Sequence, residues 1–258
     1  MEDRELEAHP DFAANLLEQI FCLWVEPELE RRGLPVDRSS IRKALVTFSP
    51  DQAQVPVVAI NEEAELIGSI RATRDIQAGE PVTEDDVAEI EGLEPANIDP
   101  NNGWIAYAVL RGQGFIQFDL RYNKERASQV LGLASEYVTA AEACLKLSPR
   151  PAVDNLYSAA ELSVHAQMFG TNSTTKQHWR RAKWLDAWAE LKNVPANHPT
   201  ILDQLHKERA AARYGDGQLS LTPDELLSMI SHVREMISFA ARRTGAFDKG
   251  TLPTPRDS

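Results

Sequence analysis

The hydrophobic period of this 258-residue chain changes near residue 121, and that change limits the folds open to it. Before this point, apolar residues come in short runs, some alternating with polar ones, which is typical of strands. After it, they recur at helical spacing through five long segments. Strands followed by helices predict an α+β fold, with an N-terminal helix and a mostly antiparallel β-sheet before an up-down helical bundle. We expect an acidic α+β domain over residues 1–121, the bundle over residues 122–246 and a flexible tail over residues 247–258.

The region before residue 121 begins with a helical pattern and continues with strand patterns. Residues 11–32 predict an amphipathic helix that Pro27 bends or splits, because proline cannot continue the helical hydrogen bonds. A second short helix is expected near Ser39 or Ser40. Five strands follow, and glycines predict a hairpin turn between the last two. Their ranges are 55–60, part of 65–74, the end of 82–90, 104–110 and 114–121.

Five helices are predicted in the second half, joined by short links that contain proline or glycine. Their ranges are 123–147, 151–169, 174–192, 200–214 and 223–243. The last begins with a capping box, in which Thr222 precedes Pro223 and Glu225. Helices joined by short links pack as antiparallel neighbours, so the pattern predicts an up-down bundle.

Several protein classes do not fit this sequence. It has no run of about 18 apolar residues for a membrane span, and its acidic start differs from a signal peptide. Cys22 and Cys144 lack metal-ligand spacing, and Glu161 and His165 lack the second Glu-x-x-His motif of a carboxylate-bridged metal site. Glycine-rich phosphate loops and nucleophile elbows are missing from the sequence. We therefore expect a cytoplasmic protein without a cofactor or a bound metal.

The charge is distributed unevenly along the chain. Residues 1–120 contain 24 acidic and 9 basic side chains, a net charge of −15. Residues 121–258 contain 15 acidic and 18 basic side chains, a net charge of +3, so the whole chain carries −12. The second half also contains five of the six histidines. The acidic half is expected to repel nucleic acid or to serve solubility, whereas the second half can accept a phosphate-bearing ligand.

Two segments of the predicted bundle carry a family resemblance. Residues 156–169 place the small residues Ser158, Ala159 and Ala160 in an apolar helix, and residues 205–214 contain the pattern R-x-x-A-R-Y. With the basic linker between them, this order resembles the HEPN (higher eukaryotes and prokaryotes nucleotide-binding) superfamily over residues 123–243. The resemblance implies a four- or five-helix bundle, frequent dimerisation and, in active members, metal-independent RNA cleavage.

The chain departs from the motif on which that cleavage rests. Active family members have an Arg followed four to six residues later by a His. Here Tyr214, Gly215 and Asp216 follow Arg209 and Arg213. Such a pair occurs at Arg4 and His9, outside the predicted bundle. The resemblance therefore implies a non-catalytic or divergent member.

The candidate catalytic residues form one stripe of a predicted helix. His206, Arg209 and Arg213 are three and four residues apart, and Tyr214 adjoins them. Guanidinium groups bind phosphate through two parallel hydrogen bonds, and histidine can exchange a proton near neutral pH. The stripe therefore predicts RNA or nucleotide binding, with an acid–base role for His206. Alternatively, Arg209 forms an ion pair with Asp203, Glu208 or another helix, and Tyr214 packs at the helix end.

A second candidate ligand-binding cluster interleaves cations with tryptophans. It consists of Lys176, His178, Arg180, Arg181 and Lys183, with Trp179, Trp184 and Trp188 among them. Aromatic rings can stack on bases while cations follow the phosphates. The four-residue spacing of Trp184 and Trp188 also fits a helix whose tryptophans are core and whose cations are solvated.

Three functions fit these features. The first is a non-catalytic or divergent HEPN-like binding and assembly protein, which binds RNA or nucleotide and acts as a homodimer or with a protein partner in a bacterial defence or toxin–antitoxin type system. The alternative is a divergent metal-independent ribonuclease that uses His206, Arg209 and Arg213. The third is a small-molecule-binding protein with a pocket between the sheet and the bundle. The missing family histidine favours the first.

Overall fold

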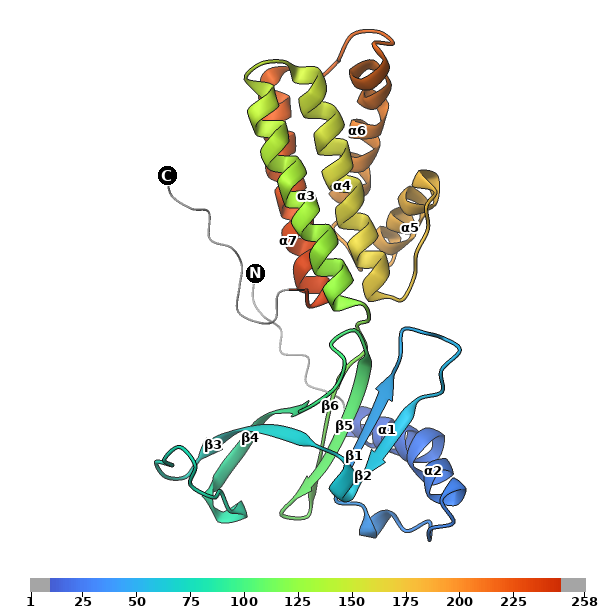
Figure 1. Cartoon of the computed structure of the whole chain (residues 1–258), viewed down its shortest axis with the longest axis vertical. Helices are drawn as coiled ribbons and strands as arrows, with labels where there is room; N and C mark the ends of the chain where they lie inside the picture. The colour runs from blue at the N-terminus through green and yellow to red at the C-terminus, as the bar shows by residue number, and fades with distance from the viewer. Residues whose placement is uncertain (1–9, 247–258) are drawn as a thin grey trace. The chain divides into compact units, whose positions relative to one another are not determined.

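A computed structural model describes residues 10–246, and it divides the chain into two compact units, residues 1–120 and 121–258. The first unit contains helices and antiparallel strands, and the described part of the second is helical (Figure 1). The α+β prediction is confirmed. The tail expected over residues 247–258 lies outside the described residues. Within the described part of the chain, no helix has the length and apolar character needed to cross a membrane.

The N-terminal helical segment, which Pro27 was expected to bend or split, consists of two α-helices joined by a π-helical turn just before the proline. Helix α1 (Pro10–Ile20) leads through one π-helical turn (Phe21–Val25) into α2 (Glu26–Arg31). In that turn the Glu26 amide donates to the Phe21 carbonyl, five residues back. The wider turn accommodates the Pro27 ring, because a π turn shifts the hydrogen-bond register where the proline lacks its N–H.

The second short helix, expected near Ser39 or Ser40, is only a single turn. Arg38–Ser40 is one 3-10 turn, capped by Asp37, whose carboxylate accepts from the Ser39 amide at 2.9 Å. Strand β1 (Lys43–Phe48) follows, and the sequence did not predict it. Its residues Ala44, Leu45 and Val46 are all buried, because both faces of the strand are covered. A strand buried on both faces lacks the alternation from which strands are recognised.

The strands form two antiparallel sheets. The first has the order β2–β1–β5–β6, with β2 at Val57–Ile60, β5 at Gly103–Leu110 and β6 at Gln113–Asp119. The second pairs β3 (Leu66–Ala72) with β4 (Val87–Pro95). The predicted hairpin joins β5 to β6 through Arg111 and Gly112, both with positive φ, as a two-residue turn between twisted strands requires.

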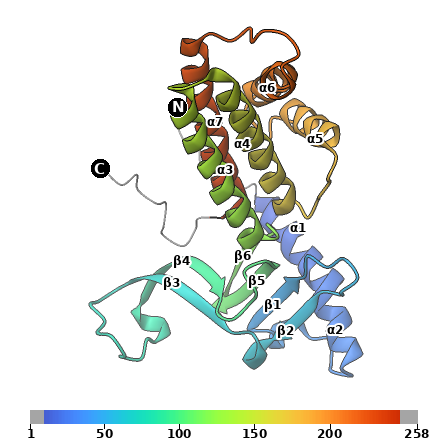
Figure 2. The ribbon, with the colours of Figure 1, turned by 45° about the horizontal axis from the view of Figure 1, so that its top comes forward.

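The four-stranded sheet carries a different layer on each face. On one face Val46 and Ile105 pack with Phe21, Val25 and Leu29 of the helical segment, and Figure 2 shows α1 and α2 beside β1 and β2. On the other face, Leu93 of β4 joins a core with Leu45, Trp104 and Ala106. The Leu93 amide also donates to the Gln117 side-chain oxygen of β6 at 2.6 Å.

The second unit is a bundle arranged around one central helix. Its helices are α3 (Lys124–Leu145), α4 (Pro149–Gly170), α5 (His178–Glu190), α6 (Asn197–Tyr214) and α7 (Pro223–Thr244). Helix α4 contacts the other four, and both Figure 1 and Figure 2 show it between α3 and α6. Alanines at the contacts, including Ala134, Ala159 and Ala160, are fully buried and allow close approach of the helices.

The link between α6 and α7 is fastened to the bundle by polar contacts. The buried Glu208 carboxylate of α6 accepts hydrogen bonds from the Ser220 amide, at 2.9 Å, and from the Ser220 hydroxyl. Arg150, near the start of α4, donates to the Gly217 carbonyl at 2.9 Å. Helix α7 then begins with the predicted capping box, in which Thr222 accepts from the Glu225 amide. These contacts hold α6 against α4.

Candidate functional site

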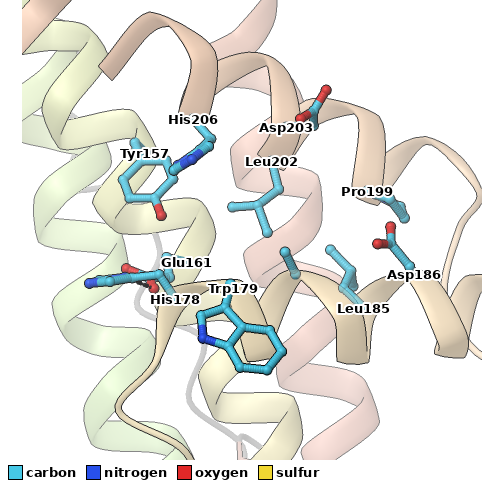
Figure 3. A pocket seen from close by; sticks show the side chains of 11 residues that line it. Tyr157, Glu161, His178, Trp179, Leu185, Asp186, Pro199, Leu202, Asp203 and His206 are labelled. Carbon is cyan, nitrogen blue, oxygen red and sulfur yellow. Dashed lines mark hydrogen bonds and ion pairs between the residues drawn. The ribbon is translucent and has the colours of Figure 1, made fainter. Parts of the chain in front are cut away.

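A pocket of about 210 Å³ opens within the bundle, between α4, α5 and α6 (Figure 3). Helix α4 contributes two polar side chains, and α5 and α6 contribute both polar and apolar ones. The lining consists of Tyr157, Glu161, His178, Trp179, Ala182, Leu185, Asp186, Pro199, Leu202, Asp203 and His206. The pocket thus combines two imidazoles, two aromatic rings, three carboxylates and an apolar floor.

The two imidazoles of the pocket come from different helices and lie near the ring of Tyr157. The His206 ring centroid is 5.6 Å from that of Tyr157, and the His178 ring centroid is 6.5 Å from it. Burial raises the pKa of the Tyr157 hydroxyl, and the carboxylate of Glu161 raises it further. Tyr157 therefore stays protonated near neutral pH and can donate a hydrogen bond between two groups that exchange protons.

A buried carboxylate positions one of these histidines. Glu161 accepts a hydrogen bond at its Oε1 from Nδ1 of His178, and the same oxygen lies 3.1 Å from a terminal nitrogen of Arg181. Arg181 is itself buried and donates to the Thr175 carbonyl at 2.9 Å. This chain of contacts fixes the start of α5 against α4. A carboxylate that accepts a hydrogen bond from Nδ1 orients the imidazole, and its Nε2 can then exchange a hydrogen bond or a proton with a ligand.

The predicted stripe on α6 divides between two places. His206 lines the pocket, whereas Arg209 lies behind Tyr157, with its guanidinium carbon 4.7 Å from the ring centroid. Nε of Arg209 is 3.4 Å from Oδ1 of Asp154 on α4, and Arg213 is 4.0 Å from the same oxygen. The ion pair that was one alternative for Arg209 therefore forms with another helix. Tyr214 is 70% exposed and does not line the pocket.

The basic cluster on α5 also divides. Lys176, Arg180 and Lys183 are exposed, whereas Arg181 is buried against Glu161. The guanidinium carbon of Arg180 lies 5.2 Å from the Trp179 ring centroid, a cation–π distance. Trp179 is 62% exposed and lines the pocket.

The other two tryptophans of α5 follow the core alternative. Trp184 and Trp188 stack on each other, with ring centroids 4.7 Å apart, and pack against the core of the bundle. His165, one turn after Glu161, does not join that carboxylate. Its ring lies 4.3 Å from that of Phe169, and burial lowers the pKa of His165 to about 4.

The pocket is polarised along its length, as Figure 3 shows. Tyr157, His178 and His206 gather at one end, where Arg209 lies behind the tyrosine. Asp186 lies at the other end beside Pro199, and Leu185 and Leu202 lie between the ends. One end therefore combines two imidazoles and a phenol with the Glu161 carboxylate, and the other carries a carboxylate that can accept hydrogen bonds, across an apolar floor.

Sequence reasoning identified His178 and His206 but missed most of the lining. The contact between Glu161 and His178 joins residues 17 apart across the link before α5, so no local spacing marks it. Trp179 had a usable signal, because it is five residues from Trp184 and so occupies a different face of the helix. No protein-family model matches the sequence, and none of the curated proteins matches it. The family resemblance therefore stays a prediction from the sequence pattern.

Proposed function

We propose that the helical bundle is a nucleotide- or RNA-binding module, with the α4–α5–α6 pocket as its binding site. The protein would then act as a non-catalytic or divergent HEPN-like binding protein that works with a partner. The observation that carries the proposal is the meeting of His178, His206 and Tyr157 at one end of a pocket with an aromatic rim and an apolar floor.

The lining matches what a nucleotide requires. Exposed aromatic rings stack on bases, and Trp179 offers such a ring at the rim with Arg180 beside it. Imidazole groups donate hydrogen bonds to phosphate, and His178 and His206 both line the pocket beside Tyr157. The bundle's share of the charge, +3 over residues 121–258, allows an anionic ligand to approach it.

Binding of a short single-stranded RNA, followed by fluorescence anisotropy, tests the proposal. Replacing Trp179 by alanine removes a stacking platform, and we expect affinity to fall by about tenfold, since stacking contributes about 1–3 kcal/mol per base. The matched control is Tyr214→Ala, an exposed aromatic of the same bundle outside the pocket, which should leave affinity unchanged. Absence of RNA binding, or a loss only in Tyr214→Ala, would contradict this site.

A second function is favoured by the buried Glu161 beside His178. In this candidate the protein is a divergent metal-independent ribonuclease, and the Glu161-oriented imidazole removes the proton of a ribose 2′-hydroxyl. The 2′-oxygen attacks phosphorus, the bond from phosphorus to the 5′-oxygen breaks, and His206 donates a proton to that oxygen. The products are a 2′,3′-cyclic phosphate and a 5′-hydroxyl. In this candidate Arg209, which lies behind Tyr157, would offset part of the charge that develops on the phosphate.

RNA cleavage in the presence of EDTA tests this second function. Wild-type protein should cleave with a bell-shaped pH profile, because one histidine acts as base and the other as acid. His178→Gln and His206→Gln should each reduce the rate at least about a hundredfold. His232→Gln, on α7 and outside the pocket, is the control and should cleave like the wild type. Equal cleavage by all four proteins, or none by the wild type, rejects the ribonuclease and leaves the binding proposal standing.

A further inference from the structure

We propose that Asp186 determines which nucleotide the pocket accepts, by binding the exocyclic amino group of an adenine or cytosine base. This inference rests on the proposed nucleotide-binding function. It adds the orientation of the nucleotide in the pocket and the class of base that the pocket accepts. The ligand would place its phosphate near the two histidines and its base near Asp186.

Asp186 lies at one end of the pocket. It lies on α5 two turns after His178, at the opposite end from the two histidines (Figure 3). Leu185 and Leu202 occupy the space between the ends, and Trp179 lies at the rim. A flat ring that contacts these apolar groups presents its edge towards Asp186.

Asp186 differs from the other two carboxylates of this pocket, each of which has an ion-pair partner. Glu161 is engaged by His178 and Arg181, and Asp203 lies 2.5 Å from the Lys207 ammonium. Within residues 10–246, Asp186 has no ion pair. An ionised carboxylate only accepts hydrogen bonds, so its ligand must supply a donor.

Adenine and cytosine meet this need for a hydrogen-bond donor. The amino groups of adenine and cytosine donate two hydrogens from the base edge. A ligand that carries only acceptors at this edge places them against the carboxylate oxygens with no hydrogen bond between them, which costs affinity. The anionic phosphate is repelled by Asp186, whereas at the histidine end Arg181 pairs with Glu161 and offsets its charge, so charge favours the same orientation.

Calorimetric titration of the full chain at pH 7 tests the inference. The probes are adenosine and cytidine 5′-monophosphates and the corresponding purine riboside and 2-pyrimidinone riboside 5′-monophosphates, which lack only the amino group. Loss of that group should weaken binding to the wild type by about tenfold for at least one base. The difference should fall to less than about twofold in Asp186→Ala. It should persist in Glu190→Ala, an exposed acidic residue one turn later that does not line the pocket.

The outcomes separate this inference from the function on which it rests. If nucleotides bind but the amino group has no effect in the wild type, or its effect survives in Asp186→Ala, the inference is overturned and the binding function stands. If all four nucleotides fail to bind while single-stranded RNA still binds, the inference is overturned as well. If neither nucleotides nor RNA bind, both proposals fail.

Discussion

The two units hold their charged side chains in different ways. In the first unit, residues 1–120, which we call the sheet unit, charged side chains pair at the surface. Examples are the contacts of Arg32 with Glu63 and of Arg38 with Glu18. In the bundle, Glu161 and Arg181 are buried together on neighbouring helices. Among the residues whose burial is described, Asp86 is the buried polar side chain of the sheet unit. The other buried polar side chains belong to the bundle and are Glu161, Ser163, Gln167, Arg181, His198, Glu208 and Thr244.

This difference shows where the fold uses polar groups to fix positions. A surface ion pair loses little hydration and gains little stability, so it tolerates change. A buried pair must be complete, because an unpaired charge in the interior is costly. In the bundle the buried Glu161 also holds His178 at the pocket. The same carboxylate therefore needs its partners in the interior and positions a histidine of the site.

The largest expected difference between the units follows from removing one carboxylate in each. Glu161→Ala leaves Arg181 buried without its partner and should lower the free energy of unfolding of the bundle by about 3 kcal/mol. Glu63→Ala, in the sheet unit, removes an exposed partner of Arg32 and should cost less than about 1 kcal/mol. Hydrogen exchange under increasing urea, read from peptides of each unit, measures both.

A control for the loss of charge lies within the bundle itself. Glu142 forms an exposed pair with Arg234 at 2.7 Å, so Glu142→Ala should resemble Glu63→Ala rather than Glu161→Ala. Equal costs for all three variants would show that burial of the Glu161 pair does not matter, and would remove the distinction between the units.

Acid should weaken the two units in different pH ranges. Burial lowers the pKa of His198 in the bundle to about 4, below its usual 6.5, so the unfolded chain binds the proton first as pH falls. The titration of His198 should therefore cost the bundle about 2 kcal/mol between pH 7 and pH 5, and His165, whose pKa burial also lowers to about 4, should add to that loss. In the sheet unit, contacts with Arg38 and Arg31 lower the pKa values of Glu18 and Glu28 to about 2. The stability that these contacts supply is lost only below the usual carboxyl pKa, near 4.5.

A single variant measures the share of His198 in the acid sensitivity. His198 is buried edge-on to Phe239, with ring centroids 5.3 Å apart, and its Nδ1 has no hydrogen-bond partner among the described residues. His198→Leu removes one of the two histidines with a lowered pKa and should reduce the pH dependence of the bundle between pH 7 and pH 5, while His165 keeps its own share. Hydrogen exchange at a series of pH values is the measurement. An unchanged slope in this variant would assign the sensitivity to other groups.

The smallest expected effects are the same in the two units. Gly112, in the β5–β6 turn, and Gly215, after α6, have φ values of +77° and +76°, and neither would bring an added methyl group within 4 Å of another atom. Replacing either glycine by alanine should cost about 1 kcal/mol, because only the backbone conformation is strained. Thermal unfolding measures both variants. A much larger cost at one position would reveal a tertiary constraint there.

The sequence predicted the bundle better than the sheet unit, for physical reasons. Long helices repeat their apolar spacing over many residues, and the predicted helices all occur with small shifts at their ends. Strand β1 escaped prediction because layers cover both of its faces and remove the alternation. The π turn before Pro27 depends on how the chain absorbs a missing hydrogen bond, which a sequence pattern does not specify.

The candidate site was predictable only in part. The spacing of His206 from Arg209 on one helix was visible, and both residues lie beside Tyr157. The contact of Glu161 with His178 required the fold, because it joins two helices across an irregular link. Asp186 lies between Trp184 and Trp188 of the predicted cluster but belongs to no chemical motif itself, and only the pocket gives it a role.

Photo-crosslinking of a 4-thiouridine-labelled single-stranded RNA to the full chain, mapped by mass spectrometry, tests the central claim most directly. We expect crosslinks in peptides that contain Tyr157, His178 or Trp179, and we expect them to disappear when an unlabelled RNA competes. Crosslinks confined to residues 10–120, or to the exposed Tyr214 at the end of α6, would contradict the α4–α5–α6 pocket as the binding site.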